Sequence, residues 1–157
     1  MKKLKVALKI LILAFLLNTS ACSPRGETIS LDEVFKTAQT KYLLALKKAK
    51  QGQRLALNAE KKITKLTSAL KGFVTASDTK MIALQSKTIA KILGEIANSA
   101  GYTSRPAFGE LQKQYQKIFT SAHSGFKVPL RTRKLLSART YSLLYRELKT
   151  TAFKLKL

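Results

Sequence analysis

One run of small and apolar residues constrains the fold most, because it keeps helical spacing from Leu31 to Phe73. Its members recur at alternating intervals of three and four residues: Leu31, Phe35, Ala38, Tyr42, Ala45, Ala49, Gly52, Ala56, Ala59, Ile63, Leu66, Leu70 and Phe73. This spacing places them on one face of an α-helix. Since the phase continues through Gly52, we expect one helix from about residue 31 to 74, about 65 Å long at 1.5 Å per residue. A glycine inside a helix costs only about 1 kcal/mol relative to alanine, but a turn at Gly52 that separates two helices is the alternative.

Three later stretches repeat this spacing. In the first, at about 78–99, the side chains expected to point inward are Met81, Ile82, Ile89, Ile92, Leu93 and Ile96. The second begins at 103–106 and has an inner stripe of Phe108, Leu111, Tyr115, Ile118 and Ala122. The third, at about 131–153, has an apolar face of Leu136, Leu143, Leu144, Leu148 and Ala152. Without strand alternation, this pattern predicts an all-α fold: an antiparallel bundle of about four helices with a long first helix.

Residues that start or stop helices stand at the ends of these stretches. Ser30 and Glu33 have the spacing of a capping box, in which each side chain accepts a hydrogen bond from the other residue's backbone N–H. Ser77 or Asp78 is placed to cap the helix at 78–99. Gly101 follows the end of that helix, where the left-handed conformation suits glycine.

The N-terminus has the three-part pattern of a secretory signal peptide. Residues 1–21 contain four lysines and no acid, with an apolar middle and small residues before the end. A membrane-spanning helix is the competing interpretation, and it needs about 20 apolar residues. The apolar run from Val6 to Leu17 is shorter and is interrupted by Lys9. We therefore expect residues 1–21 to be a signal peptide.

The single cysteine of the chain, Cys22, directly follows that segment. The stretch Thr19-Ser20-Ala21-Cys22 resembles the lipobox of bacterial lipoproteins. The resemblance implies cleavage before Cys22 and lipidation of Cys22, including an acyl chain such as palmitate. Leucine is commonest in that family where Thr19 stands here, so cleavage by ordinary signal peptidase is the alternative, again with Cys22 as the first residue. Ser23 after the cysteine implies the outer membrane in preference to the inner membrane.

The remainder of the chain is strongly basic. Residues 1–21 hold four of the 30 basic residues and none of the eight acids, so their removal leaves 26 basic and 8 acidic residues and a net charge of +18. We interpret residues 22–29 as the lipidated cysteine with a short tether, and residues 30–157 as one basic helical domain. A domain of this length can bury a modest core.

Motifs for chemistry are scarce. The chain has no phosphate-binding glycine loop and no paired cysteines. His123 is the only histidine, and the stretch 111–146 contains no carboxylate that could orient it. Two S-x-x-K matches, at Ser68 and Ser77, lack the companion motifs of penicillin-recognising enzymes. We expect no enzyme activity, no catalytic residue, no metal, no cofactor and no small-molecule substrate.

Basic residues form two clusters in the domain. In the first, Lys47, Lys48, Lys50 and Arg54 are followed by Lys61, Lys62 and Lys65. The second surrounds the start of the last helix and consists of Lys127, Arg131, Arg133, Lys134 and Arg139. Charge runs are usually solvated helix faces, but so large an excess destabilises a compact state through self-repulsion. We therefore expect an anionic partner to be bound by Lys61, Lys62, Lys65 and the second cluster.

Together these features predict a lipid-anchored protein of the bacterial cell envelope. Its basic domain is expected to bind an anionic lipid, an envelope polymer or an acidic protein, as an accessory to a larger envelope assembly. The alternative is a nucleic-acid-binding helical module, since clustered Lys and Arg with a pI above 10 are typical of such modules. Export disfavours nucleic acid as the partner.

Overall fold

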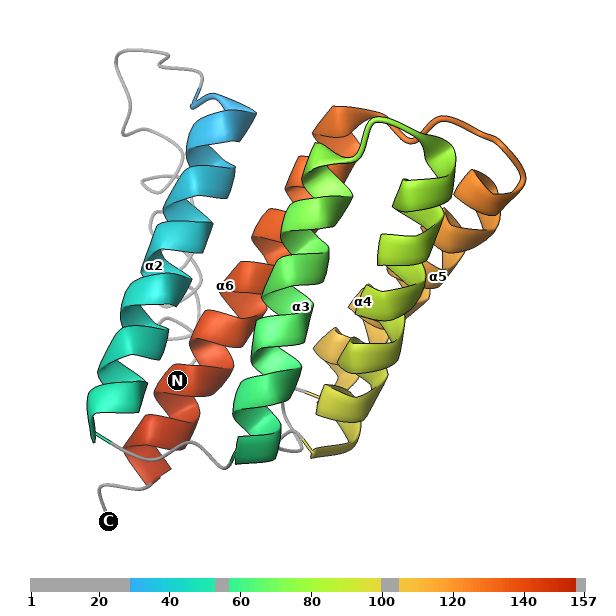
Figure 1. The fold of residues 1–157 in the computed structure, drawn as a ribbon. Coiled ribbons are helices and arrows are strands. Elements are labelled where there is room, and N and C mark those ends of the chain that lie inside the picture. The colour runs from blue at the N-terminus through green and yellow to red at the C-terminus, as the bar shows by residue number, and fades with distance from the viewer. Residues whose placement is uncertain (1–28, 53–56, 100–104, 155–157) are drawn as a thin grey trace, which may run out of the picture.

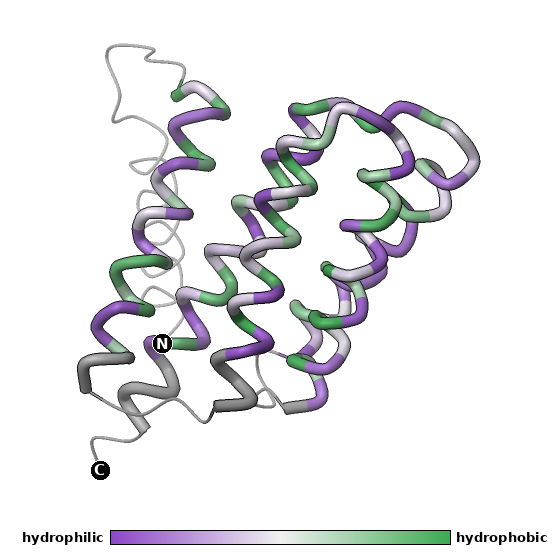
Figure 2. Tube along the Cα trace, in the orientation of Figure 1, coloured by the Kyte–Doolittle hydropathy of each residue, from purple (hydrophilic) through white to green (hydrophobic). Residues whose placement is uncertain are grey.

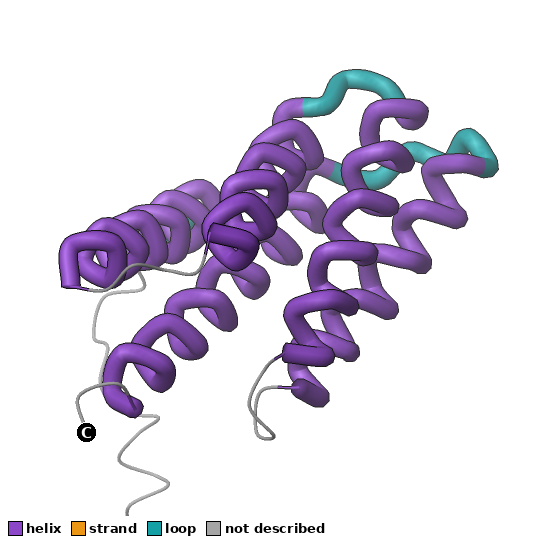
Figure 3. The backbone as a smooth tube through the Cα atoms, turned by 60° about the horizontal axis from the view of Figure 1, so that its bottom comes forward, coloured by secondary structure: helices purple, strands orange, loops and turns teal. Residues whose placement is uncertain are grey.

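The computed structural model describes residues 29–52, 57–99 and 105–154 of the chain. In these ranges it contains five helices: α2 (Leu31–Gly52), α3 (Leu57–Thr75), α4 (Thr79–Ser99), α5 (Arg105–His123) and α6 (Leu130–Lys154). Figure 1 shows them side by side, with α2, α4 and α6 running in one direction and α3 and α5 in the other. Figure 3 shows helices and loops and no strand in the described ranges. The predicted all-α bundle is confirmed.

The prediction of a single long first helix, from about residue 31 to 74, is wrong. α2 ends at Gly52, α3 begins at Leu57, and the two helices run in opposite directions (Figure 1). The alternative, a break at Gly52, is therefore correct. A helix of about 65 Å would extend far beyond α4, whose 21 residues span about 32 Å. Because the chain folds back, both halves of the apolar stripe are covered, α2 by α6 and α3 by α4 and α6.

The helices form two close pairs that α3 joins. α4 packs along α5 as an antiparallel pair, and α2 packs along α6 as a parallel pair. α3 lies against α4 and more lightly against α6, and α6 also contacts α5. α6 therefore contacts three other helices, α2, α3 and α5. None of the described helices combines the length and the apolar character that crossing a bilayer requires.

Two of the predicted helix starts are confirmed. In the capping box before α2, the Ser30 N–H donates to Glu33 Oε2 at 3.1 Å, and the Glu33 N–H donates to Ser30 Oγ at 3.2 Å. Before α4, Asp78 is the capping residue, because its Oδ1 accepts the Met81 N–H at 2.7 Å. Both caps satisfy N–H groups that the first turn of a helix leaves without partners.

The end of α5 is a glycine stop. Gly125 has a φ of +84°, which glycine adopts without the steric cost that a Cβ brings. Its N–H donates to the Ala122 carbonyl at 3.0 Å, and the N–H of Phe126 donates to the Ser121 carbonyl at 3.0 Å. These two bonds define a Schellman motif. The other predicted glycine stop, Gly101, lies outside the described residues.

The predicted apolar stripes supply most of the core. Their buried members are Ala38, Tyr42, Leu66, Leu70, Phe73, Ile82, Ile89, Ile92, Leu93, Phe108, Leu111, Tyr115, Ala122, Leu136, Leu143 and Leu144. Figure 2 shows hydrophobic and hydrophilic residues alternating along each helix, as burial of one face requires. Met81, which was expected to point inward, is 42% exposed, because it lies in the first turn of α4 at the end of the bundle. The side chain of Ala152 lies outside the described part.

α6 also buries polar residues. Ser137 and Thr140 are fully buried. Thr140 Oγ1 donates to the Leu136 carbonyl at 2.8 Å and lies 3.1 Å from the Tyr115 hydroxyl, which is the donor in that second bond. Burial raises the pKa of Tyr115, so its hydroxyl keeps the proton that it donates. This bond links α5 to α6 inside the core.

Candidate anion-binding surfaces

The predicted basic cluster around the start of α6 is divided by the fold. Lys127, Arg131 and Arg139 are exposed, Lys134 is half-buried, and Arg133 is buried. These five residues, named the α6 cluster below, therefore do not present their charges on one surface.

Arg133 is part of the fold. Its Nη1 donates to the carbonyl oxygens of Phe73 at 2.9 Å, Val74 at 3.0 Å and Ala76 at 2.8 Å. These carbonyls lie at or just after the end of α3, where a helix lacks internal donors and its dipole favours a cation. Burial lowers the pKa of the Arg133 guanidinium from its ordinary value. The expectation that Arg133 binds an outside anion is wrong, because its guanidinium caps α3.

Lys134 is also engaged within the domain. Its Nζ forms an ion pair with Asp32 Oδ1, which joins α6 to the first turn of α2. The hydrogen bond from Lys134 and its positive charge lower the pKa of Asp32. Lys134 therefore links the starts of two parallel helices, and less of its charge is available to a partner.

The predicted lysines of α3 line a groove instead. Lys61, Lys62 and Lys65 lie on the α4 side of α3, and Lys87 and Lys91 of α4 line the same groove. Lys61 and Lys65 are four residues apart, as are Lys87 and Lys91, so each pair occupies one helical face. The short turn between α3 and α4 brings the two faces together. These five residues are named the groove lysines.

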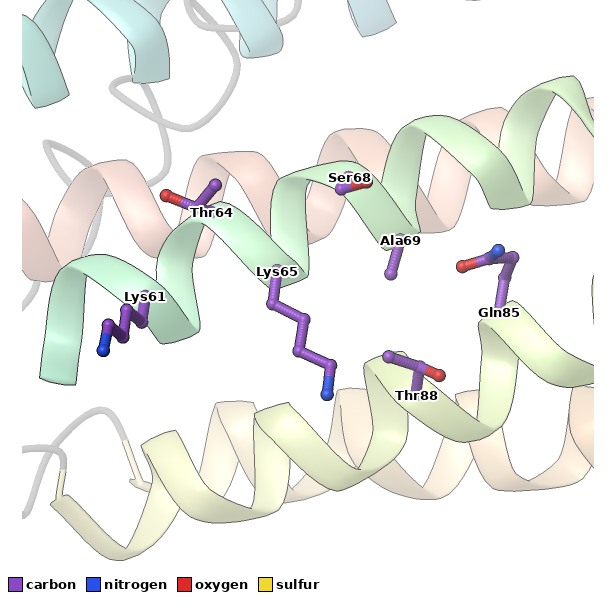
Figure 4. Close-up of a pocket in the computed structure, with 7 residues that line it drawn as sticks. All are labelled: Lys61, Thr64, Lys65, Ser68, Ala69, Gln85 and Thr88. Atoms are coloured by element: carbon purple, nitrogen blue, oxygen red, sulfur yellow. The ribbon is translucent and has the colours of Figure 1, made fainter.

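The groove consists of two adjoining hollows of about 580 and 490 Å³, which share Lys61, Lys65 and Thr88. Figure 4 shows the first hollow, with Lys65 reaching from α3 toward α4. Gln85 and Thr88 of α4 face it from the opposite side, and Ala69 of α3 points between them. The groove thus combines ammonium groups with amide and hydroxyl groups over a partly apolar floor.

Only one acid faces these lysines among the described residues of the groove. Glu95 Oε2 lies 3.3 Å from Lys62 Nζ, and both side chains remain accessible, at 38% and 45%. Lys87 Nζ lies 5.7 Å from the ring centroid of Phe119 on α5, a cation–π distance. Five cations and one anion leave a net positive charge in the groove, which concentrates anions near it.

Sequence reasoning missed Lys87 and Lys91 because they do not form a run. Their spacing of four, which matches that of Lys61 and Lys65, could have identified them once the two helices were taken as antiparallel neighbours. Lys47 and Lys48 of the first basic cluster are exposed on α2, whereas the side chains of Lys50 and Arg54 lie outside the described part.

Groups suited to other chemistry are dispersed. The described residues contain no group of three or more His, Cys, Asp or Glu side chains that could hold a metal ion. His123 is exposed at the end of α5, with its ring centroid 5.5 Å from that of Phe119. Ser68 lines the groove, and Ser77 is exposed in the turn before α4. Of His123, Ser68 and Ser77, only Ser68 lies in the groove.

No protein-family model, curated protein or solved structure matches the chain. Cys22 and the predicted signal peptide lie outside the described residues. Function must therefore be inferred from the groove and from the N-terminal sequence pattern.

Proposed function

We propose that this chain is a lipid-anchored protein of the bacterial cell envelope, in which Cys22 holds the domain at a membrane and the α3–α4 groove binds an anionic envelope component. The convergence of five lysines from two helices against one carboxylate carries the binding part of the proposal. The lipobox resemblance of residues 19–22 supports the anchor.

The placement of the groove lysines favours a ligand over a role in solubility alone. Like charges four residues apart on a helix destabilise it by about 0.2–0.5 kcal/mol per pair. The groove contains two such pairs on facing helices. Lysines dispersed over the surface would keep the protein soluble equally well without this convergence. An anionic ligand would offset the repulsion.

The spacing of the lysines indicates the chemistry of that ligand. Lys61 and Lys65 are separated by about 6 Å along α3, and Lys87 and Lys91 by the same rise along α4. A ligand with two or more anionic groups suits this arrangement, because each pair of lysines can contact a separate group. Phosphate-bearing envelope polymers and glycolipids belong to this class. The Gln85 amide can donate a hydrogen bond to the same ligand.

The lipid anchor is tested in cells that express the full chain. A clickable fatty acid should label the wild-type protein, and Cys22→Ser should abolish the label, because the thioether to the lipid requires sulfur. Equal labelling of the two proteins would contradict the anchor.

The groove is tested with soluble inorganic polyphosphate and two triple variants that remove the same charge. The groove variant carries Lys61→Gln, Lys65→Gln and Lys87→Gln. The control variant carries Lys127→Gln, Arg131→Gln and Arg139→Gln, which change exposed residues of the α6 cluster. We expect the groove variant to bind at least about tenfold more weakly, and its slope of log affinity against log salt to fall by about 2–3. The control should change both quantities much less.

Equal losses in the two variants would mean that net charge alone attracts polyphosphate, and the groove would then have no special role. Duplex DNA serves as a further probe at the same salt concentrations. Tighter binding to DNA than to polyphosphate, lost in the groove variant, would favour a nucleic-acid partner over an envelope component.

A further inference from the structure

One end of the bundle collects the starts of α2, α4 and α6 and the ends of α3 and α5 (Figure 1). The Lys134–Asp32 ion pair joins the start of α6 to the start of α2. The hydrogen bonds from Arg133 to the carbonyls of residues 73, 74 and 76 join the start of α6 to the end of α3. The chain enters the described domain here, at Ile29, so this end is named the tether end.

The tether end exposes apolar side chains. Ile29 is 70% exposed and Phe126 is 69% exposed, more than any other large hydrophobic residue that the structure describes. Leu130 and Met81, at the same end, are 45% and 42% exposed. In a Schellman motif the residue after the glycine often packs on a hydrophobic residue of the last helical turn. Ser121 stands at that position, so Phe126 lacks such a partner.

Exposed cations accompany these apolar residues. Lys80, Lys127 and Arg131 are exposed and lie next to Met81, Phe126 and Leu130 along the chain. Among the described residues, the acids at this end are Asp32, Glu33 and Asp78. Asp32 is paired with Lys134, and the other two accept backbone N–H bonds from Ser30 and Met81. Exposed apolar groups beside free Lys and Arg are typical of surfaces that bind anionic lipid.

The length of chain before Ile29 limits where a membrane can lie. Cys22 precedes Ile29 by seven residues, which can span at most about 25 Å even when fully extended. The 22 residues of α2 alone extend about 33 Å away from that point. An anchor at Cys22 therefore holds the tether end within about 25 Å of the bilayer.

We propose that the tether end is a second membrane contact, which inserts Phe126, Ile29 and Leu130 into the interface of an anionic phospholipid bilayer. Lys80, Lys127 and Arg131 then contact lipid phosphates. The bundle stands on the membrane by this end, and the α3–α4 groove along its side faces the aqueous compartment. This inference rests on the proposed lipid anchor, and it explains how a membrane-bound domain keeps its groove open to a polyanion.

The absence of tryptophan from the chain permits a direct test. The test uses three single-tryptophan variants of the full chain, Phe126→Trp, Leu44→Trp and Leu84→Trp. Each is purified with whatever lipid the cells attach to Cys22. They are reconstituted into phosphatidylcholine–phosphatidylglycerol vesicles whose acyl chains are brominated. All three positions are exposed, and Leu44 lies about 20 Å along α2 from Leu31. Leu84 lines the groove. Circular dichroism confirms that each variant is helical.

We expect the bromines to quench the tryptophan emission of the Phe126→Trp variant by about half or more, because an interfacial side chain reaches about 5–10 Å into the boundary of head groups and acyl chains. Emission from the variant at 44 should be unchanged, and the variant at 84, about 5 Å along α4 from Met81, should be quenched less than the variant at 126. Lys127→Gln with Arg131→Gln should reduce the quenching at 126 at low salt. Quenching at 84 without quenching at 126 would mean that the bundle lies on its groove side. Either that result or unquenched emission from all three vesicle-bound variants would overturn the inference.

Mass spectrometry of the same preparations separates this inference from the proposed anchor. If Cys22 carries no lipid, its thiol, the only one in the chain, is coupled to a maleimide lipid in the vesicles. Quenching at position 126 after coupling would support the membrane contact even though the lipoprotein proposal had failed. Vesicle-bound protein that is lipidated on Cys22 but unquenched at 126 would refute the membrane contact and leave the anchor in place.

Discussion

The α6 cluster and the groove lysines each contain five cations, yet the fold uses them differently. In the α6 cluster, one side chain caps a helix, one forms an ion pair between helices, and three are exposed. The groove lysines all line one cavity, and one acid faces them. The difference teaches that helical phase, not charge density along the chain, decides whether a basic residue is available to a partner.

Helical phase explains why Arg133 is buried. Arg133, Ser137, Thr140 and Leu144 follow a 4-3-4 spacing, and all four are buried. A residue on this face points into the bundle whatever its polarity, and a charged one must then find a polar partner. The free carbonyls at the end of α3 provide it. Arg131 lies on another face of the same helix and remains exposed.

The largest effect on the free energy of unfolding is expected from substitutions at two neighbouring positions of α3, one on the buried face of the helix and one on the exposed face. Leu66 is fully buried, and Lys65 is exposed in the groove. Leu66→Asp should lower the free energy of unfolding by about 4 kcal/mol or more, because an unpaired charge is placed in the core. Lys65→Asp should change it by less than about 0.5 kcal/mol. Urea unfolding of the chain without residues 1–21 measures both, and equal midpoints would mean that the assigned faces of α3 are wrong.

The next largest effect separates two arginines of α6. Arg133→Met should lower the free energy of unfolding by on the order of 3 kcal/mol, because three carbonyls lose a charged donor. Arg131→Met removes the same charge from an exposed position and should cost less than about 0.5 kcal/mol. The midpoints of urea unfolding at constant m-value compare the two. Equal stability of these variants would show that Arg133 is not a structural cap, and the contrast between the two clusters would be lost.

The parts of the fold that depend on local sequence were predictable. The Ser30–Glu33 capping box and the Asp78 cap each involve residues three positions apart, so their partners can be identified from the chain itself. The apolar stripes also identified most of the core, because burial follows helical phase.

Long-range relationships were not predictable in the same way. The carbonyl partners of Arg133 are 57–60 residues away in the chain, so no local pattern reveals them. The 3-4 spacing of small and apolar residues continues through Gly52, so it did not indicate the break there. Two separate helices that fold back on each other can keep the same spacing. For the candidate site, the sequence identified the three lysines of α3. It missed Lys87 and Lys91, whose importance depends on the packing of α4 against α3.

A smaller effect concerns the ion pair of the α6 cluster and depends on pH. The hydrogen bond and charge of Lys134 lower the pKa of Asp32 below its ordinary value of 3.8. The unfolded chain therefore binds this proton at higher pH than the folded one. The stabilisation is complete above the ordinary value and is lost as the pH falls through the lower value of the folded protein. Asp32→Asn should be less stable than wild type near neutral pH, and this difference should disappear at the acidic end.

Lys134→Met provides the control for that titration. Without the ammonium group, the pKa of Asp32 should return toward its ordinary value, and the stability difference caused by Asp32→Asn should become smaller and less dependent on pH. Urea midpoints measured at several pH values between neutrality and strong acid test both statements. An unchanged pH profile in Lys134→Met would mean that another group lowers the pKa of Asp32.

The smallest effect on the free energy of unfolding is expected from substitution of the groove lysines. These substitutions should stabilise the domain slightly, whereas those described above should destabilise it. Replacing Lys61, Lys65 and Lys87 by Gln removes the like-charge pairs on both helices, each of which destabilises a helix by about 0.2–0.5 kcal/mol. The variant should therefore unfold at the same urea concentration as wild type or at a slightly higher one. At about 1 M salt, where the Debye length is near 3 Å, the two midpoints should converge. A loss of more than about 1 kcal/mol would place the groove lysines with Arg133 among the structural cations. Unchanged or higher stability, combined with weaker polyphosphate binding, would instead separate the two roles: charge that holds the bundle together, and charge that the bundle presents to a ligand.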